Sequence, residues 1–243
     1  MITRATGLEL REVVAGYGGQ PILHGVSFSL RTGETLVVVG PNGSGKSTLM
    51  KVAVGLLRPF SGEISLGTAD VTSLAAPARA ARGLAYVPQE ANVFRNMTVL
   101  ENLRVGYEFV ASSAGPRFGE RLEAVLELFP EIRIKLRTAA GHLSGGQRQM
   151  VAMAAALMPK PSVLALDEPS AGLSPRNAEI LFEVIRRVAA SGVTLLIVEQ
   201  NTQLGLGAAD QGIVLVNGRV RLAAPAATVL SDPDIRRLYL GEA

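Results

Sequence analysis

One glycine-rich segment, Gly40–Ser47 (GPNGSGKS), restricts the fold of this chain more than any other feature. It follows the apolar run TLVVV and opens a segment of helical character, Lys46–Leu56. Glycine backbones approach an anion without side-chain clash and a helix N-terminus is partly positive, so this context predicts a phosphate-binding loop. We expect Lys46 to contact the β- and γ-phosphates of ATP or GTP and the Ser47 hydroxyl to ligate Mg²⁺. The residues expected to bind the nucleotide here are Gly40, Pro41, Asn42, Gly43, Ser44, Gly45, Lys46, Ser47 and Thr48.

Short apolar runs rich in β-branched residues recur along the 243-residue chain, which is 48% hydrophobic and long enough for a full core. Segments of helical spacing lie between these runs, and this alternation predicts an α/β fold with a mostly parallel sheet covered on both faces. Strands are expected at Leu36–Val39, Val163–Leu166, Val193–Val198 and Gly212–Val216, and helices through Leu122–Phe129 and Ile180–Val188.

Two parts of the chain depart from this pattern. Alternating apolar residues in Glu9–Ala15 and Val26–Leu30, together with Glu63–Leu66, predict an antiparallel sheet at the edge of the core. Residues 90–159 have little strand character and several helical segments, with a turn-rich break at Ser112–Gly119, which predicts an inserted helical subdomain. We expect one domain over residues 1–243, in which residues 1–89 and 160–243 form the P-loop core and its antiparallel part.

Two carboxylates, Asp167 and Glu168, follow the apolar run that begins at Ser162. Parallel strands present their carboxyl ends to the ligand crevice, so both acids are expected near the phosphate-binding loop. Asp167 is then expected to hold Mg²⁺ through water, and Glu168 to polarise the water that attacks the γ-phosphate. Solvated acids at a strand end are the structural alternative.

A second helix-end anion site is predicted at Leu143–Gln147 (LSGGQ), before the apolar segment Arg148–Leu157. Ser144 is a suitable N-cap, and Gly145 and Gly146 expose the first backbone N–H groups. One nucleotide does not require two such sites, so helix chemistry alone favours a plain capped helix.

With LSGGQ placed between the phosphate-binding loop and LALDEP, the chain resembles the ATP-binding subunits of ABC transporters over essentially its whole length. The resemblance implies the ABC ATPase fold and a head-to-tail dimer of two such subunits, which enclose each ATP between the phosphate-binding loop of one and the LSGGQ of the other. Ser144, Gly145, Gly146 and Gln147 are therefore expected to contact the ATP bound by the partner subunit. The resemblance also implies that the helical subdomain docks onto a transmembrane permease.

Other positions acquire roles through this resemblance. Tyr17 matches the aromatic residue that stacks on adenine. Gln89, in YVPQ, matches the glutamine that senses Mg²⁺ and the γ-phosphate and links the core to the helical subdomain. Ser170–Ser174 matches the D-loop at the dimer interface. The metal ligands implied are Ser47, Gln89 and Asp167.

Two positions depart from the family pattern. Ser174 stands where the D-loop usually has aspartate, and Gln200 stands where the switch residue is usually histidine. Glutamine can donate a hydrogen bond to a γ-phosphate but cannot become cationic, so we expect ATP binding to be intact and leave the hydrolysis rate open. The expected catalytic residues are Lys46, Glu168 and Gln200. The two histidines, His24 and His142, lie outside the switch position and are interpreted as structural.

Five segments resemble the ATPases of branched-chain amino acid importers, which implies transmembrane permease subunits and, indirectly, a solute-binding protein. The resemblance implies that these segments contact the permease or the dimer partner and not the solute, so the ATPase of a urea or short-amide importer fits as well. A soluble ABC-type ATPase and a P-loop kinase or GTPase are further alternatives, although the chain has no long coiled coil, second cassette or NKxD motif. The five segments are Val87–Gln89, Val93–Leu103, Leu128–Pro130, Val198–Asn201 and Ile235–Gly241.

Composition restricts partners and location. Lys and Arg total 24 against 21 Asp and Glu, a net charge of +3 that is too mild to indicate a nucleic acid partner. The chain has no cysteine, which suits a cytosolic protein. It also has no apolar stretch long enough to span a bilayer or serve as a secretion signal. We expect a cytoplasmic protein that is peripheral on the inner face of the cell membrane.

Overall fold

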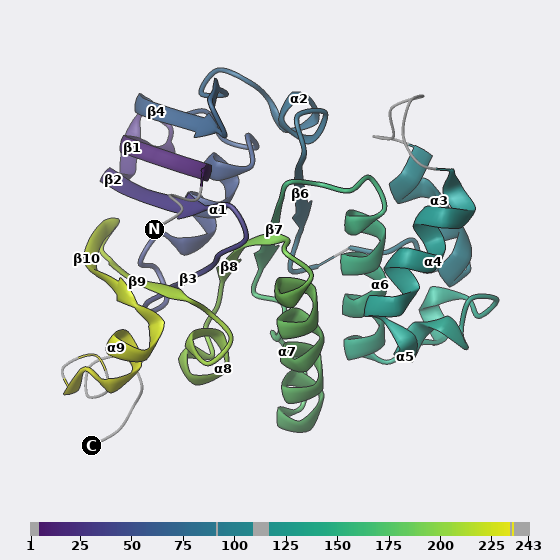
Figure 1. Ribbon diagram of the computed structural model, residues 1–243. Helices are drawn as coiled ribbons and strands as arrows, with labels where there is room; N and C mark the ends of the chain where they lie inside the picture. Colours follow the sequence, from purple (N-terminus) through teal and green to yellow (C-terminus); the bar gives the residue numbers. More distant parts are fainter. Residues whose placement is uncertain (1–4, 91, 109–116, 234, 236–243) are drawn as a thin grey trace.

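The computed structural model describes residues 5–90, 92–108, 117–233 and 235, and arranges them around two β-sheets (Figure 1). The larger sheet has the order β10-β9-β3-β8-β7-β6, and its pairs are parallel except for β9 and β10. The smaller sheet is antiparallel, with the order β2-β1-β4-β5. The strands are β1 (Thr6–Tyr17), β2 (Gln20–Arg31), β3 (Thr35–Val39), β4 (Ser61–Leu66), β5 (Ala69–Asp70), β6 (Leu84–Val87), β7 (Val163–Asp167), β8 (Thr194–Val198), β9 (Gln211–Val216) and β10 (Arg219–Pro225).

Strand β3 shows how the larger sheet is covered on both faces, since all of its residues are buried. Val37 and Val39 belong to a core shared with α6 (Gly145–Leu157) and α7 (Pro175–Ala190). Leu36 and Val38 belong to a second core, shared with α1 (Lys46–Ala53) and the antiparallel sheet. Helix α1 is therefore packed between the two sheets.

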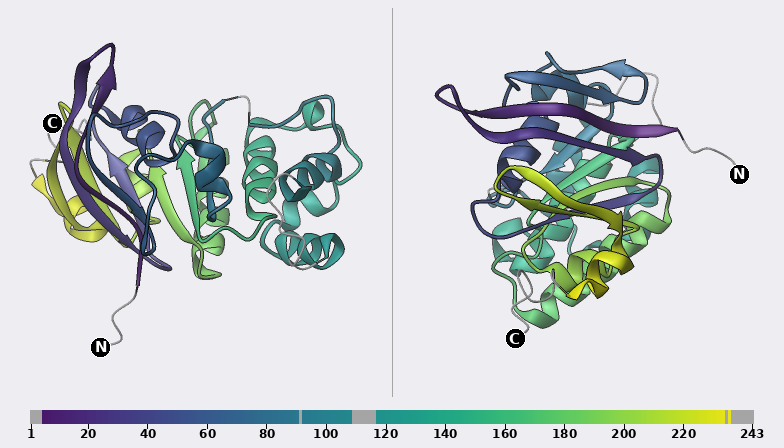
Figure 2. Two further views of the ribbon diagram at one scale, coloured as in Figure 1. Left: turned by 90° about the horizontal axis from the view of Figure 1, so that it is seen from above. Right: turned by 90° about the vertical axis from the view of Figure 1, so that its left-hand side faces the viewer.

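The helical part of the chain gathers at the end of the molecule opposite the antiparallel sheet (Figure 2). Of the turn-rich break predicted at Ser112–Gly119, residues 112–116 lie outside the described part, and Phe118 and Gly119 begin a helix instead. Among the described residues, every helix is too short or too polar to traverse a bilayer. The helices in this part are α3 (Val99–Glu108), α4 (Phe118–Leu128), α5 (Pro130–Arg133), the 3₁₀ helix η1 (Ala140–His142) and α6.

The predicted fold class is confirmed: a mostly parallel α/β core carries an antiparallel edge sheet and a helical part. The sequence pattern did not indicate β6 or β10. Strand β6 is an apolar run of four residues with only its two end residues buried, and β10 alternates exposed with half-buried positions. The helix predicted over Lys46–Leu56 ends at Ala53. The remaining helices are α2 (Ala76–Ala80), α8 (Thr202–Leu206) and α9 (Ala226–Ser231).

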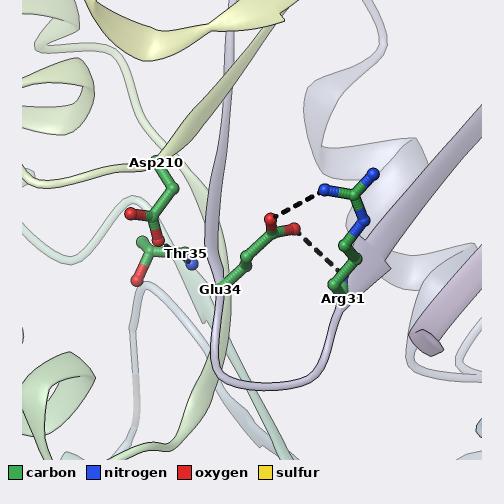
Figure 3. Close-up of polar contacts among 4 residues, drawn as sticks. All are labelled: Arg31, Glu34, Thr35 and Asp210. Atoms are coloured by element: carbon green, nitrogen blue, oxygen red, sulfur yellow. Dashed lines mark hydrogen bonds and ion pairs between the residues drawn. The ribbon is translucent and has the colours of Figure 1, made fainter. Parts of the chain in front are cut away.

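Polar contacts fix the start of β3 (Figure 3). Glu34 accepts hydrogen bonds from the Arg31 backbone N–H at 3.2 Å and from the Arg31 guanidinium at 3.4 Å. The Asp210 carboxylate accepts from the Thr35 backbone N–H at 2.8 Å. The Glu34 bonds lie within the turn between β2 and β3. The Asp210 bond joins Thr35 to the residue before β9, so it fixes the position from which β3 runs toward the phosphate-binding loop.

A buried arginine holds the C-terminal end of α1. Arg79 is 1% exposed and donates to the carbonyl oxygens of Val52 at 2.8 Å and Ala53 at 2.7 Å. Burial lowers its pKa to about 10, and the carbonyl groups at a helix C-terminus favour the cation that burial disfavours. The C-terminal end of α1 is thus fixed, which helps to position the loop at the N-terminus of the helix.

Candidate active site

The phosphate-binding loop lies between the carboxyl end of β3 and the N-terminus of α1, as the sequence predicted. Gly40 has no room for a side chain, because a Cβ there would lie 2.1 Å from the carbonyl oxygen of Leu215. Gly45, the N-cap of α1, has a φ of 102°, which favours glycine. Gly40 allows the loop to pack against β9, and Gly45 allows the backbone to turn from the loop into α1.

The Lys46 ammonium lies inside this loop. Lys46 is 5% exposed, and its Nζ donates to the carbonyl oxygens of Gly40 at 2.8 Å and Pro41 at 3.1 Å. Burial lowers the pKa of Lys46, while the negative charges of Glu168, Glu199 and Asp167 act in the opposite direction. A phosphate in the loop would supply a further negative charge to this buried cation.

The two serines of the loop fit a nucleotide and Mg²⁺. The Ser44 hydroxyl is buried, and within the part of the chain that the structure describes it has no hydrogen-bond partner, so a polar ligand would satisfy it. Ser47 is exposed in the first turn of α1. Hydroxyl and carboxylate oxygens are ligands that Mg²⁺ prefers, and the ion would neutralise charge on the phosphate oxygens.

Asp167 ends strand β7 and is 8% exposed. Burial raises its pKa, and a hydrogen bond from the Tyr86 hydroxyl, at 3.1 Å from Oδ2, acts in the opposite direction. Burial, and next the contact with the Asp167 carboxylate, raise the pKa of Tyr86. Tyr86 therefore orients the carboxylate that is expected to face the metal.

Glu168 has an unusual backbone conformation, with φ at 44°, and its N–H donates to the Val198 carbonyl oxygen at 2.8 Å. Positive φ at a residue other than glycine is costly and concentrates at functional sites. The Gln89 side-chain amide donates to Glu168 Oε2 at 3.3 Å. The structure therefore brings together two residues that are 79 positions apart and that the sequence placed in one site.

Gln200 lies two residues after β8, and its side-chain amide donates to Oδ1 of the Asn42 side chain in the phosphate-binding loop. The switch position and this loop are therefore in direct contact. His24 lies in β2 and His142 in η1, both outside this contact.

Tyr17 ends β1 and is 47% exposed. The Lys51 ammonium lies 5.7 Å from the centre of its ring and 3.4 Å from its hydroxyl. An exposed aromatic face near the loop remains suited to stacking on a base, and Lys51, on α1, restricts the orientation of the ring.

The LSGGQ segment forms the N-terminus of α6. The Ser144 hydroxyl accepts from the Gln147 backbone N–H, and the Gln147 side chain accepts from the Ser144 N–H, which is a capping box. A Cβ at Gly145 would lie 2.9 Å from the Leu173 side chain, and one at Gly146 would lie 3.7 Å from Asn177 Cβ. The LSGGQ helix start thus lies beside the start of α7, whereas the phosphate-binding loop precedes α1.

Three residues near the site were missed by sequence reasoning: Tyr86, Lys51 and Glu199. Glu199 is 1% exposed and accepts three backbone hydrogen bonds. Its position, directly before Gln200, was the one available signal. Tyr86, three residues before Gln89, could similarly have been noted.

The loops after β3, β7 and β8 surround an open polar cavity of about 690 Å³. Its lining combines the phosphate-binding loop with the expected D-loop and switch segments. The residues that line this cavity include Gly40, Asn42, Ser170, Leu173, Glu199 and Gln200.

Replacing Gly40 with alanine is expected to destabilise the protein by about 1–3 kcal/mol, because the new Cβ would overlap a backbone oxygen that cannot move freely. Thermal unfolding measures the effect. Gly43→Ala is a control from the same loop, since a Cβ at Gly43 would meet nothing within 4 Å, although its φ of 77° adds some strain. Equal melting temperatures for wild type and Gly40→Ala would contradict the packing described.

A loop that cradles phosphate between a parallel strand and a helix, with an acidic pair at a nearby strand end, defines the class of P-loop ATPases. The LSGGQ sequence at the capped start of α6 indicates one family within this class. The model of the ABC transporter family matches residues 23–171, and the chain belongs to this family. It is an ATP-binding subunit whose hydrolysis of ATP is coupled to transport.

Relatives agree with this assignment over nearly the full length. A probable branched-chain amino acid transport ATP-binding protein LivF of Archaeoglobus fulgidus is 43% identical, over 93% of this chain and 95% of that protein. The high-affinity branched-chain amino acid transport ATP-binding protein BraG of Pseudomonas aeruginosa is 38% identical, over 96% and 99%. A lipopolysaccharide export system ATP-binding protein LptB of Acidithiobacillus ferridurans is 36% identical, over 97% of each chain.

Solved structures show the same fold. The ADP conformation of an ATP-binding cassette of an ABC transporter superposes with a TM-score of 0.86, at 31% identity, over 98% of this chain and 99% of that one. A nucleotide-free cassette from an ABC transporter gives a TM-score of 0.84, at 30% identity, over 98% and 100%. The predicted ABC ATPase fold and the resemblance to branched-chain amino acid transport ATPases are confirmed.

Proposed function

We propose that this chain energises an importer of branched-chain amino acids, working on the cytoplasmic face of the membrane with a second ATPase subunit and transmembrane permease subunits. A solute-binding protein outside the membrane would deliver the amino acid. The observation that carries the proposal is the similarity to LivF and BraG at 43% and 38% identity, over almost the entire chain.

The site itself supports a shared dimer mechanism. The phosphate-binding loop and the LSGGQ helix are two anion sites on different helices, α1 and α6, and the LSGGQ glycines face Leu173 and Asn177. In a symmetric dimer, the phosphate-binding loop of one subunit and the LSGGQ helix of the other can bind the same nucleotide, so each dimer holds two shared sites. Ser144, Gly145, Gly146 and Gln147 then contact the partner's ATP.

Within each site, the roles follow from position. Lys46 and the loop amides bind the phosphates, while Ser47, Asp167 and Gln89 hold Mg²⁺, directly or through water. Glu168 accepts a hydrogen bond from the attacking water, and Gln200, held at Asn42, donates to the γ-phosphate. Tyr17 stacks on the adenine.

A mostly apolar groove of about 950 Å³ suits the permease. It runs between the core, at α2 and β6, and the helical part, at α3 and α6. Two large apolar side chains in its lining, Leu56 and Phe94, are 56% and 53% exposed. A short segment of the permease would cover them. Pro88, Asn92 and Pro159 line this groove, which supports our placing the limits of the helical subdomain near residues 90 and 159.

Transport in liposomes tests the proposal. The chain is reconstituted with the membrane proteins and the second ATPase that co-purify with it, and labelled leucine is supplied with its solute-binding protein. We expect leucine accumulation that depends on ATP on the ATPase side. Accumulation of urea instead would support the alternative importer, and ATP hydrolysis without uptake of either solute would contradict import.

Mixing two inactive variants tests the shared site. Ser144→Arg blocks the LSGGQ of one subunit and Lys46→Ala disables the phosphate-binding loop of the other. We expect each variant alone to be inactive and the mixture to recover turnover, because the mixed dimer holds one intact site. A mixed dimer that forms and stays inactive would contradict the assignment of Ser144 to the partner's ATP.

The similarity to LptB, at 36% identity, favours one second candidate, the ATPase of a lipopolysaccharide exporter. The two candidates differ in the membrane protein that fills the groove. The complex with the co-purified permease is assayed for ATP hydrolysis with lipopolysaccharide and with leucine. Faster hydrolysis with lipopolysaccharide would favour the exporter.

A further inference from the structure

A buried carboxylate with no role in the scheme above joins two loops of the site. Glu199 follows β8 directly and is 1% exposed. Its Oε1 accepts from the Ser170 N–H at 2.9 Å. Its Oε2 accepts from the N–H groups of Gln200 at 2.8 Å and Asn201 at 3.0 Å. Both carboxylate oxygens are therefore engaged, each by a different loop.

The two loops carry groups expected to act on the nucleotide. Ser170 lies two residues after Glu168, and Gln200 contacts Asn42 of the phosphate-binding loop. Ser170, Glu199, Gln200 and Asn42 all line the same polar cavity. Any displacement of the Glu199 carboxylate would therefore move the loop after Glu168 relative to the switch segment.

Glu199 itself has little freedom. Its backbone N–H donates to the Val38 carbonyl oxygen at 3.1 Å, which ties it to β3. A Cβ at Gly205 of α8 would approach Glu199 Cβ to 3.3 Å, so the helix lies close against the side chain. Hydrogen bonds from N–H groups to a carboxylate are about twice as strong as neutral ones, and a buried acceptor lost from such a set leaves donors unsatisfied.

We infer that Glu199 is a positioning residue for ATP hydrolysis: it holds the loop that follows Glu168 and the switch segment as one unit against the phosphate-binding loop. The inference rests on the roles proposed above for Glu168 and Gln200. Glu199 does not touch the reacting atoms; it fixes the distance between the residue that activates water and the residue that faces the γ-phosphate.

The variant Glu199→Gln tests this inference, because the amide has the same shape but turns a donor toward one of the two loops. In the full chain, we expect kcat for ATP to fall by about 10-fold to 100-fold, while the ATP dissociation constant changes by less than about threefold. Glu34→Gln is the matched control. Glu34 is also a buried carboxylate that accepts a backbone N–H, but it lies in the turn before β3, and kcat should remain at the wild-type value.

Hydrogen exchange at single amides provides a readout that does not depend on turnover. In Glu199→Gln, the new donor opposes the N–H groups of one loop and should shift the side chain from the position that also serves the other loop. The amides of Ser170 and of Gln200 or Asn201 should therefore exchange faster together, with other protected amides of β3 and β8 unchanged. Faster exchange in one loop only, or a kcat that falls no more than in Glu34→Gln, would overturn the inference. A wild-type chain without ATPase activity would contradict the proposed roles of Glu168 and Gln200 and leave the exchange result as the test of the linkage itself.

If Glu199→Gln does not fold, Glu199→Asp replaces it, because it keeps the charge and shortens the side chain by one methylene. It should show the same selective loss of kcat, to a smaller degree. Equal losses in kcat and in nucleotide affinity would overturn the inference, since they would indicate general damage to the site.

Discussion

Glu168→Gln is expected to lower ATP turnover by at least about 100-fold and to leave ATP affinity within about threefold of wild type. The amide has the shape of the carboxylate but cannot accept a proton from the attacking water, whereas the phosphate contacts of Lys46 and the loop are untouched. Steady-state phosphate release and nucleotide titration measure the two quantities. Because ATP then binds without being consumed, ATP-dependent dimers should accumulate in size-exclusion chromatography.

The control for this variant is Glu183→Gln, an exposed position on α7, which removes the same charge away from the cavity. It should hydrolyse ATP at the wild-type rate. Normal turnover in Glu168→Gln would exclude Glu168 as the group that polarises water. A loss of ATP affinity equal to the loss of turnover would instead indicate a structural role for its backbone bond to Val198.

Lys46→Ala should weaken ATP binding by at least about 100-fold, because it removes the charge-assisted hydrogen bonds that we propose to the β- and γ-phosphates. It also leaves the carbonyl groups of Gly40 and Pro41 without the donor that now satisfies them, although it removes a buried cation whose pKa is lowered by that burial. Equilibrium titration with a fluorescent ATP analogue measures the affinity, and thermal unfolding in the absence of nucleotide measures the effect on stability.

Lys135→Ala, in the turn after α5, serves as the control for loss of a lysine and should bind ATP as wild type does. Unchanged affinity in Lys46→Ala would contradict the phosphate-binding loop. A melting temperature far below that of wild type would show that the loop depends on Lys46 for its fold as well as for its ligand.

The parts of the fold that could be predicted are those fixed by local chemistry. The phosphate-binding loop, the Ser144 cap and the apolar strands each depend on residues that are adjacent in the sequence. The structure confirms the position of β3, β7, β8 and β9 for this reason. By contrast, β10 was missed because it pairs at the edge of the sheet and buries only alternate side chains.

The site shows the same division. The residue types in the acidic pair and the switch segment were evident, but the contacts that orient them are not local. Tyr86 and Asp167 are 81 positions apart, and Gln200 and Asn42 are 158 apart. Glu199 was missed because a glutamate after a strand usually faces solvent, and only the packing of β3, β8 and α8 around it shows that it is buried.

The capping box on α6 has a consequence for association. It engages the N–H groups of Ser144 and Gln147, and a helix start leaves four N–H groups without partners inside the helix, so those of Gly145 and Gly146 remain for an external acceptor. The capping box fixes the orientation of these two N–H groups in the single subunit, so little conformational entropy is lost when an acceptor binds to them. In the proposed dimer, the ATP of the partner subunit supplies that acceptor, so self-association of the chain should rise and fall with the supply of nucleotide.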